Sequence, residues 1–367
     1  MRSGRDAAGD GTTAPVPRAN PELVGREGAE RALLELFRSG RLPHALLLCG
    51  PRGIGKATLA YRFARFVLAS GAGGPPARLF SDADENGLAV APESGTFRRV
   101  ASGGHADLLT VERAWDPRRN RLRGEIVVDD TREIAAFLRL TPAEGGWRVV
   151  IIDGADEMNR NAANALLKIL EEPPRRALLL LVAHSPGLLL PTIRSRCRRF
   201  PLMPLPDEIV RHLLGRYRPD LPEPRAAALV TLSGGSIGRA LDLADVDGVG
   251  LYRSILALLA RGSVIDMAEL HAFADRLGRS DAESAYRVVE ELLGQLLARL
   301  AVRSAHGTSA ADREGELLDH LAGRSSAARW AELRDEIGGS FARTDALNLD
   351  RKQTILSAFF AIGDAAR

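Results

Sequence analysis

Hydrophobic and polar positions along the first half of the chain follow two alternating patterns. Runs of consecutive apolar residues have the length of buried strands, and they lie at 44–49, 107–111, 147–153 and 177–183, with a further short strand around Phe200. Between them, apolar residues recur every three or four positions, which predicts helices at 27–39, 59–68, 129–140 and 159–172. Strands that alternate with helices predict an α/β fold, with a parallel sheet covered on both faces.

After residue 206 only helical spacing remains. Short helices are predicted at 207–217 and 224–233, and another begins at 234–241. The rest of the chain is predicted to form helices at 251–259, 266–277, 282–303, 312–321, 327–337 and 344–362. We interpret the part from residue 248 onward as a separate helical bundle.

Three polar segments fall outside these patterns. Residues 1–19 are rich in Gly, Ala, Thr, Pro and charge, and they predict a disordered tail. Residues 71–104 are rich in Gly, Pro, Ser and Asp, and we expect a long, mostly irregular insertion. Residues 113–123 form the third polar segment, which contains clustered arginines.

A glycine-rich stretch with one lysine separates the first predicted strand from the next helix. It reads Gly-Pro-Arg-Gly-Ile-Gly-Lys-Ala-Thr over residues 50–58. Strand, glycine-rich loop, lysine and helix are the context of a phosphate-binding loop. Gly50, Gly53 and Gly55 let the backbone N–H groups wrap an anion, the helix N-terminus faces the same anion, and Lys56 supplies a full charge. Lysine is otherwise found only at positions 168 and 352 in this arginine-rich chain.

The loop lacks one chemical part. A hydrolysing loop carries Ser or Thr after its lysine, and that hydroxyl holds the magnesium ion. Ala57 stands at this position and has no oxygen. Thr58 comes one residue late and faces elsewhere on the helix, so it enters the site only as a candidate nucleotide contact.

A second chemical part is missing at the end of the strand at 147–153. Asp153 is placed to help hold magnesium beside the loop, but the next residue, where many hydrolases carry a catalytic Glu, is Gly154. Asp156 and Glu157 lie further along the chain. Either could take the place of that Glu only if the backbone followed a different path from that in hydrolases. Because both parts are missing, the sequence predicts that the chain does not hydrolyse nucleotide at a useful rate, whether or not the loop still holds one.

Four arginines fall within residues 194–199, behind the last apolar strand. One interpretation is a solvated basic face, and the residues alone favour it. The other is an arginine finger that enters a neighbour's phosphate site and stabilises transition-state charge.

Composition narrows the classes of function. The net charge of +3 and the pI near 9.1 are too mild to require nucleic acid as a partner. The two cysteines, Cys49 and Cys197, have no spacing typical of a metal site or a disulfide framework. There is no apolar signal core and no apolar run of membrane-spanning length, so we expect a cytoplasmic protein without a membrane partner.

Four stretches together resemble the clamp-loader branch of the AAA+ family, and within it the delta-prime subunits of bacterial DNA polymerase III. They are the loop at 50–58, Ile-Ile-Asp-Gly-Ala-Asp-Glu-Met at 151–158, Asn-Ala-Leu-Leu-Lys-Ile-Leu-Glu-Glu-Pro-Pro at 164–174 and Ile-Arg-Ser-Arg-Cys at 193–197. The resemblance covers about residues 20–244. It implies an AAA+ P-loop domain at 20–205, a helical lid at 206–245 and a helical collar at 246–367.

The resemblance also implies a role in DNA replication. It suggests a non-hydrolysing stator in a pentameric clamp loader, contacting motor (gamma/tau) and delta subunits through collar and AAA+ faces, at the replisome on the nucleoid. Sliding clamp and primed DNA would be reached through the complex. Arg196, in the Ser-Arg-Cys motif, would be the finger for a motor subunit's ATP site. ATP or ADP, if bound in the chain's own loop, would not be hydrolysed.

Two departures from the family pattern matter. Residues 71–104 contain no cysteine, so the zinc module of related subunits is not expected. The lid position where motor subunits carry a nucleotide-sensing arginine holds Gly238, and Arg239 is one step away. His184 is interpreted as a turn residue without a role. Two alternatives stay open: an ATP-hydrolysing AAA+ motor subunit, and a DNA-binding protein that uses the arginines at 118–123 and 194–199.

Overall fold

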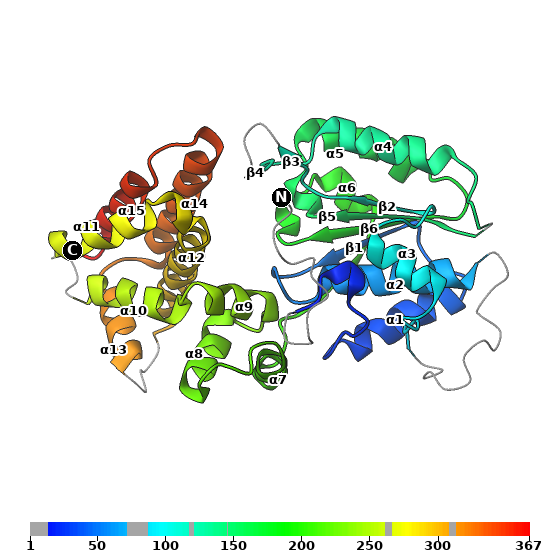
Figure 1. Ribbon diagram of the computed structural model, residues 1–367. Helices are drawn as coiled ribbons and strands as arrows, with labels where there is room; N and C mark the ends of the chain where they lie inside the picture. Colours follow the sequence, from blue (N-terminus) through cyan, green and yellow to red (C-terminus); the bar gives the residue numbers. More distant parts are fainter. Residues whose placement is uncertain (1–13, 72–86, 117–120, 145, 261–265, 308–312) are drawn as a thin grey trace. The chain divides into compact units, whose positions relative to one another are not determined.

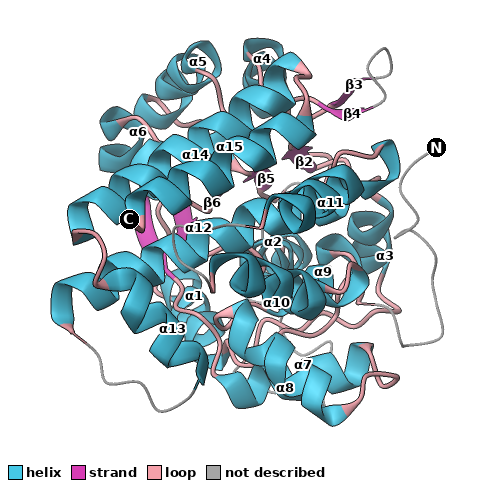
Figure 2. Ribbon diagram, turned by 90° about the vertical axis from the view of Figure 1, so that its left-hand side faces the viewer, coloured by secondary structure: helices cyan, strands magenta, loops and turns pink. Residues whose placement is uncertain are grey.

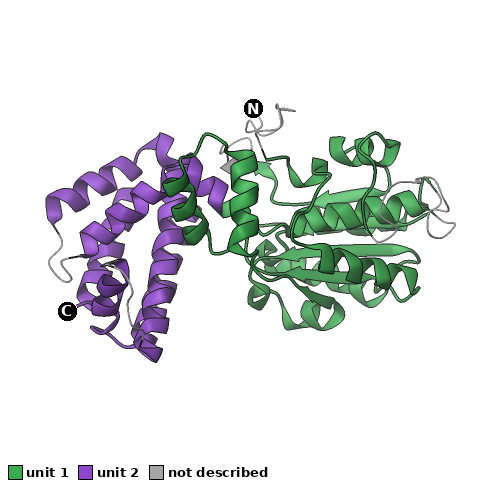
Figure 3. Ribbon diagram, turned by 90° about the horizontal axis from the view of Figure 1, so that it is seen from below, with its two compact units in different colours: residues 1–239 green, residues 240–367 purple. Residues whose placement is uncertain are grey.

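The computed structural model describes residues 14–71, 87–116, 121–144, 146–260, 266–307 and 313–367 (Figure 1). The chain divides into two compact units, residues 1–239 and residues 240–367, which are coloured separately in Figure 3. The boundary falls inside helix α9 (Ile237–Asp245), within the segment expected to form a lid. The division into three domains stays a prediction.

The first unit is built on a parallel sheet of five strands in the order β2-β5-β6-β1-β7. The strands are β1 (Ala45–Cys49), β2 (Leu108–Val111), β5 (Arg148–Asp153), β6 (Ala177–Ala183) and β7 (Arg198–Pro201). In the central pair, Ala45 is opposite Leu179 and Cys49 is opposite Ala183. The predicted α/β fold with a parallel sheet is confirmed.

Helices cover both faces of this sheet, because consecutive strand residues point to opposite sides. On one face, Leu46, Leu48 and Ile151 pack with buried residues of α1 (Glu27–Arg38) and α2 (Lys56–Ser70). On the other face, strand residues such as Leu47 and Ile152 join a core with α4 (Val128–Arg139), α5 (Arg160–Glu171) and α6 (Pro191–Arg196). Figure 1 shows the sheet between these two helical layers.

After β7, all the regular elements of the described chain are helices. The first unit ends with α7 (Asp207–Tyr217), α8 (Glu223–Ser233) and the start of α9. The second unit contains α10 (Gly248–Leu259), α11 (Met267–Leu277), α12 (Glu283–His306), α13 (Arg313–Ala322), α14 (Ala327–Leu347) and α15 (Arg351–Ala365). Figure 2 shows its helices in cyan. In the described part of the chain, every helix is too short or too polar to cross a bilayer.

The predicted boundary between the last two helices was wrong. Helix α14 continues to Leu347, and the break lies at residues 348–350 instead of 338–343. Asn348 adopts a left-handed conformation (φ 55°), which Asn tolerates better than most residues. Asp350 then caps α15 by accepting hydrogen bonds from the N–H groups of Lys352 and Gln353.

The expected irregular insertion contains a helix. Residues 72–86 lie outside the described chain, but α3 spans Gly95–Ser102. Ser94 caps it by accepting from the N–H of Phe97 at 3.1 Å, and Gly103 ends it in a left-handed conformation. Phe97 and Val100 are buried, so a short amphipathic face stabilises the helix.

The expected disordered tail is also ordered at its end. Residues 1–13 lie outside the described chain, whereas Pro17–Ala19 form a 3₁₀ turn, η1. The buried Arg65 of α2 donates to the carbonyls of Arg18 and Asn20 at 2.9 and 2.6 Å, and its guanidinium stacks on Phe97. These contacts fasten the segment before α1 onto α2 and α3.

The polar segment at residues 113–123 contains a small hairpin. Strands β3 (Trp115–Asp116) and β4 (Arg121–Leu122) pair antiparallel, and residues 117–120 between them are outside the described chain. Arg118 and Arg119, two of the arginines behind the DNA-binding alternative, lie outside the described residues.

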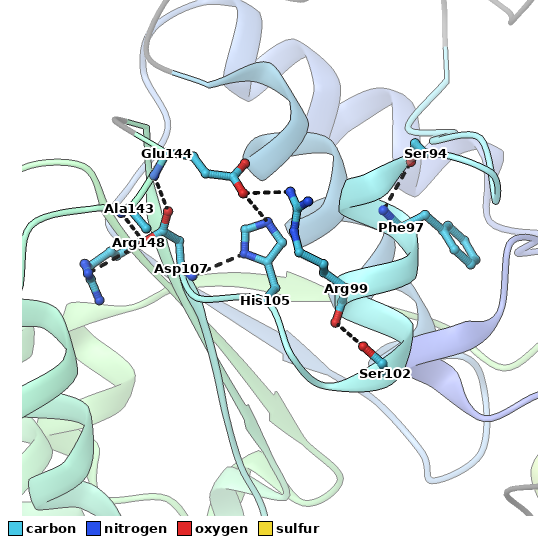
Figure 4. A network of polar contacts seen from close by, with 9 residues as sticks. All are labelled: Ser94, Phe97, Arg99, Ser102, His105, Asp107, Ala143, Glu144 and Arg148. Carbon is cyan, nitrogen blue, oxygen red and sulfur yellow. Dashed lines mark hydrogen bonds and ion pairs between the residues drawn. The ribbon is translucent and has the colours of Figure 1, made fainter.

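A buried carboxylate, Asp107, ties the loop after α4 to the edge of the sheet (Figure 4). It accepts from the N–H groups of Ala143 and Glu144 at 2.8 and 3.0 Å and faces Arg148 at 3.6 Å. The Glu144 carboxylate pairs with Arg99 of α3 at 2.6 Å. This network joins β2, β5, α3 and the loop after α4.

Candidate nucleotide site and surface arginine

The glycine-rich loop follows β1 and leads directly into α2, in the strand–loop–helix context expected from the sequence. Gly50, Gly53 and Gly55 all have positive φ angles, of 146°, 75° and 94°. A Cβ on Gly50 would lie 2.3 Å from the carbonyl oxygen of Leu202, and one on Gly55 would lie 2.9 Å from Leu23. Both the backbone angles and the close packing therefore require glycine.

Lys56 begins α2 and its side chain is buried, with 3% exposed. Its Nζ donates to the carbonyls of Gly50 and Pro51 at 2.7 and 2.5 Å. Burial lowers the pKa of Lys56 to about 8, although the charges of Asp153 and Asp156 oppose this shift. The ammonium is therefore held inside the curve of the loop.

Asp153 lies at the carboxyl end of β5, opposite Val182 of β6. Burial raises the pKa of Asp153 to about 6, the neighbouring charge of Glu112 adds to this rise, and Lys56 opposes it. The loop lysine and this carboxylate thus act on each other electrostatically, as expected for two parts of one site.

The backbone turns sharply directly after Asp153. Gly154 has φ +82°, and a 3₁₀ turn follows at Ala155–Glu157. A Cβ on Gly154 would lie 2.7 Å from Oε2 of Glu157, so this carboxylate folds back over Gly154. Arg113 pairs with the same oxygen at 2.8 Å.

A pocket of about 240 Å³ opens beside these residues. It is lined by Arg52, Glu112, Arg113, Leu122, Asp153, Gly154, Glu157 and His184. Sequence reasoning did not include Glu112 or Arg113 in the site. The available signal was their place directly after β2, since the carboxyl ends of parallel strands meet at one edge of a sheet.

His184, interpreted from the sequence as a turn residue, has a side chain that lines this pocket. Its backbone N–H and that of Ser185 donate to the Asp156 carboxylate at 3.0 and 2.6 Å. Burial, together with the charge of Lys56, lowers the pKa of His184 to about 4. The imidazole is therefore neutral at pH 7.

The first turn of α2 carries no hydroxyl at the position that binds magnesium in hydrolases. Ala57 is half-buried there, and Thr58 is buried in α2 one residue further on. Gly50, Gly53, Gly55 and Lys56 lie together with Asp153 beside them, and their role in binding an anion stays a prediction. Among the described residues, no group of three or more His, Cys, Asp or Glu side chains could hold a metal ion.

Arg196 is not among the residues that line the pocket. It lies at the end of α6, where its Nη1 donates to the carbonyl of Thr192 at 3.0 Å and its Nη2 pairs with Glu171 at 2.7 Å. About a third of the Arg196 side chain, 35%, is exposed. The flanking Ile193 and Cys197 are buried and anchor the helix.

Comparison with known proteins places this site in a family. Residues 25–206 match the family described as "DNA polymerase III, delta subunit". Through this segment, the chain belongs to the DNA polymerase III delta-prime subunit family. The segment contains the loop, Asp153 and Arg196, but not Gly238.

Curated relatives of the chain are also subunits of DNA polymerase III. The chain is 39% identical to the DNA polymerase III subunit delta' of Pseudomonas aeruginosa over 201 residues, which are 53% of this chain and 53% of that protein. It is 32% identical to the DNA polymerase III subunit tau of Escherichia coli K12 over 235 residues, 62% of this chain and 33% of that protein. The chain thus aligns with about half the length or less of these relatives.

A solved structure is similar over most of the chain. The DNA polymerase III gamma subunit-related protein of Thermotoga maritima is 20% identical, with a TM-score of 0.41, covering 91% of this chain and 99% of the other.

Proposed function

We propose that this chain is a clamp-loader subunit of DNA polymerase III that does not hydrolyse nucleotide and supplies Arg196 to the ATP site of a neighbouring motor subunit. Family membership supports the clamp-loader part. The motor (gamma/tau) and delta subunits are its proposed partners, contacted through the second unit and the faces of the first. The sliding clamp and primed DNA are reached through the complex.

The observation that carries the proposal is the contrast between the chain's own site and its surface arginine. Ala57 offers no hydroxyl to magnesium, and Gly154 offers no carboxylate to a water molecule. Any ATP or ADP in the loop is held by backbone N–H groups and Lys56 without turnover. We further propose that the chain needs no zinc.

Arg196 has the properties of a group that acts on another chain. Its helix is anchored by buried neighbours, while its guanidinium reaches the surface and pairs with Glu171. Exposed ion pairs of this kind contribute only about 0–1 kcal/mol, so a phosphate from a neighbouring subunit can replace Glu171 at small cost. A planar guanidinium also suits bidentate contact with phosphate.

The test uses the reconstituted clamp loader with its motor and delta subunits, sliding clamp and primed DNA. We expect Arg196→Ala to lower DNA-stimulated ATP turnover about ten-fold or more at the affected site, because an arginine finger contributes about 10³–10⁵ in rate. Arg198→Ala, an exposed arginine two residues away, is the control and is expected to leave turnover unchanged. Unchanged turnover with Arg196→Ala in a fully assembled complex would contradict the proposal.

One observation favours a second function, ATP hydrolysis by the chain itself. The Glu157 carboxylate folds back over Gly154 and lines the same pocket as Asp153, where it could activate a water molecule. Burial raises the pKa of Glu157, which suits a general base. Magnesium-dependent ATPase activity of the purified chain that Lys56→Ala abolishes would support this alternative.

A further inference from the structure

The small hairpin of the first unit presents two large apolar side chains to solvent. Trp115 of β3 is 49% exposed, and Leu122 of β4 is 45% exposed. The two residues are directly opposite each other in the hairpin, so their side chains leave the same face of it. Figures 1 and 2 show β3 and β4 at the margin of the first unit. We call Trp115 and Leu122 together the hairpin surface.

Both ends of the hairpin are fastened to the turn that follows β5. Arg113, before β3, pairs with the Glu157 carboxylate at 2.8 Å. Ile126, after β4, is buried, and its N–H donates to the carbonyl of Glu157 at 2.9 Å. Within the hairpin, the N–H of Arg123 donates to the carbonyl of Ala114 at 2.9 Å. The hairpin surface is therefore held in place before a partner arrives, which lowers the entropic cost of binding.

The charge around the hairpin surface is strongly positive. Residues 113–123 contain five arginines and one aspartate. Two exposed carboxylates, Glu112 and Glu125, flank this segment, and the sequence stays net positive when they are included. Arg123, next to Leu122 in the chain, is exposed. Such a concentration of positive charge suits a polyanion as the partner.

The size and the chemistry of the hairpin surface favour a single nucleic-acid strand over a protein. A stable protein interface buries about 800 Å² on each partner, which is far more than two side chains on two-residue strands provide. An aromatic ring among arginines is instead a common way to hold single-stranded nucleic acid, because bases stack on the ring while the arginines attract the backbone. The bases of a duplex are stacked on one another and offer no free face.

The neighbouring pocket does not extend this site. Leu122 belongs to its lining, but Glu112, Asp153 and Glu157 line it as well, against the two arginines Arg52 and Arg113. A phosphate in the pocket would meet more negative than positive side chains. The exposed face of the hairpin, outside the pocket, is therefore the surface that suits a nucleic-acid backbone.

We propose that the hairpin surface binds single-stranded DNA, with one base stacked on Trp115, Leu122 as its apolar neighbour and Arg123 near a backbone phosphate. The choice of DNA follows from membership of a DNA polymerase III family. The chain thus contacts DNA directly, in addition to reaching it through other subunits. This contact does not depend on Arg196 acting on a neighbour.

The test measures binding of the full chain to a fluorescently labelled oligothymidylate of about 20 nucleotides by fluorescence anisotropy. We expect binding that weakens as the salt concentration rises, because each neutralised phosphate releases counterions. A duplex of the same length is expected to bind about ten-fold more weakly, because its bases cannot stack on Trp115.

The decisive variants exchange the ring of Trp115. Trp115→Leu keeps an apolar pair across the hairpin and should weaken oligothymidylate binding about ten-fold, because the stacked base is lost, whereas Trp115→Phe keeps a ring and should weaken it less. Phe360→Leu removes another exposed ring, in α15, and is the control that should leave binding unchanged. Oligothymidylate should quench the tryptophan fluorescence of wild type more than that of Trp115→Phe, since Trp330 is buried and Trp147 half-buried.

The charge contact is tested separately. Arg123→Gln should reduce the slope of log affinity against log salt by about 0.7, the value for one phosphate contact on a single strand, and Arg31→Gln at an exposed position of α1 should not. No binding of oligothymidylate by wild type at low salt, equal binding of the duplex, or unchanged binding by Trp115→Leu would overturn the proposal. Normal DNA binding by Trp115→Leu with loss of a subunit from the reconstituted clamp loader would overturn it in favour of a protein contact.

Discussion

Replacement of Lys56 by Met should change how the stability of the chain depends on pH. Burial lowers the pKa of Lys56 from 10.5 to about 8 in the folded chain. Between these two values the folded state has released the proton and the unfolded state still holds it. Because the unfolded state then binds more protons, the free energy of unfolding rises with pH over this window.

The size of the effect follows from the shift. A pKa difference of about 2.5 units corresponds to about 3 kcal/mol at 1.36 kcal/mol per unit. The charged ammonium thus costs the folded chain about 3 kcal/mol below pH 8, and this cost disappears towards pH 10.5. Lys56→Met has no such group, so the stability of wild type relative to the variant should rise by about that amount from pH 7 to pH 10.5.

The assay is urea unfolding at a series of pH values, followed by tryptophan fluorescence. Trp330 lies in the second unit, so a Trp330→Phe background restricts the signal to tryptophans of the first unit. Lys168→Met removes an exposed ammonium from α5 and serves as the control for the loss of a lysine side chain. A difference between wild type and Lys56→Met that stays constant with pH would refute the buried-ammonium reasoning.

Two further substitutions test how the first unit is held together. Asp107→Asn should lower the free energy of unfolding by about 2–4 kcal/mol, because one buried acceptor and the charge facing Arg148 are lost. In the same urea titration, the control Asp129→Asn at an exposed position should change the free energy of unfolding by less than about 0.5 kcal/mol. Arg65→Met should cost about 2–4 kcal/mol by removing the donors to two backbone carbonyls, and limited proteolysis should cut the segment before α1 sooner than in wild type.

The sheet and the loop could be predicted because their signals are local. Apolar runs of strand length and glycines spaced around Lys56 need no distant contact to be recognised. Helix α3 was missed because Gly and Pro dominate the composition of its surroundings, and its apolar face is only Phe97 and Val100. Helix α14 was cut short at two consecutive glycines, but the buried Phe341 beyond them keeps the chain helical against its neighbours.

The rest of the candidate site depends on tertiary contacts that no local pattern contains. Glu157 reaches Gly154 only because a left-handed glycine and a 3₁₀ turn reverse the chain there. The sequence predicted only that Gly238 stands where motor subunits carry a lid arginine. Its contact with Gly53 depends on how the helices around it pack. The roles of Arg196, of the loop residues and of Asp153 stay predictions.

The pKa of Lys56 offers a test of whether the loop still binds an anion. Lys56 and Asp153 both have pKa values shifted towards their neutral forms by burial, so each charged group destabilises the folded chain at pH 7. A bound anion such as the phosphates of ADP would reverse the shift of Lys56, because an opposite charge favours the ammonium. The rise in stability of wild type over Lys56→Met between pH 8 and 10.5 should therefore shrink in saturating ADP if the loop binds nucleotide. An unchanged rise in ADP would mean that Lys56 serves only to hold the carbonyls of Gly50 and Pro51.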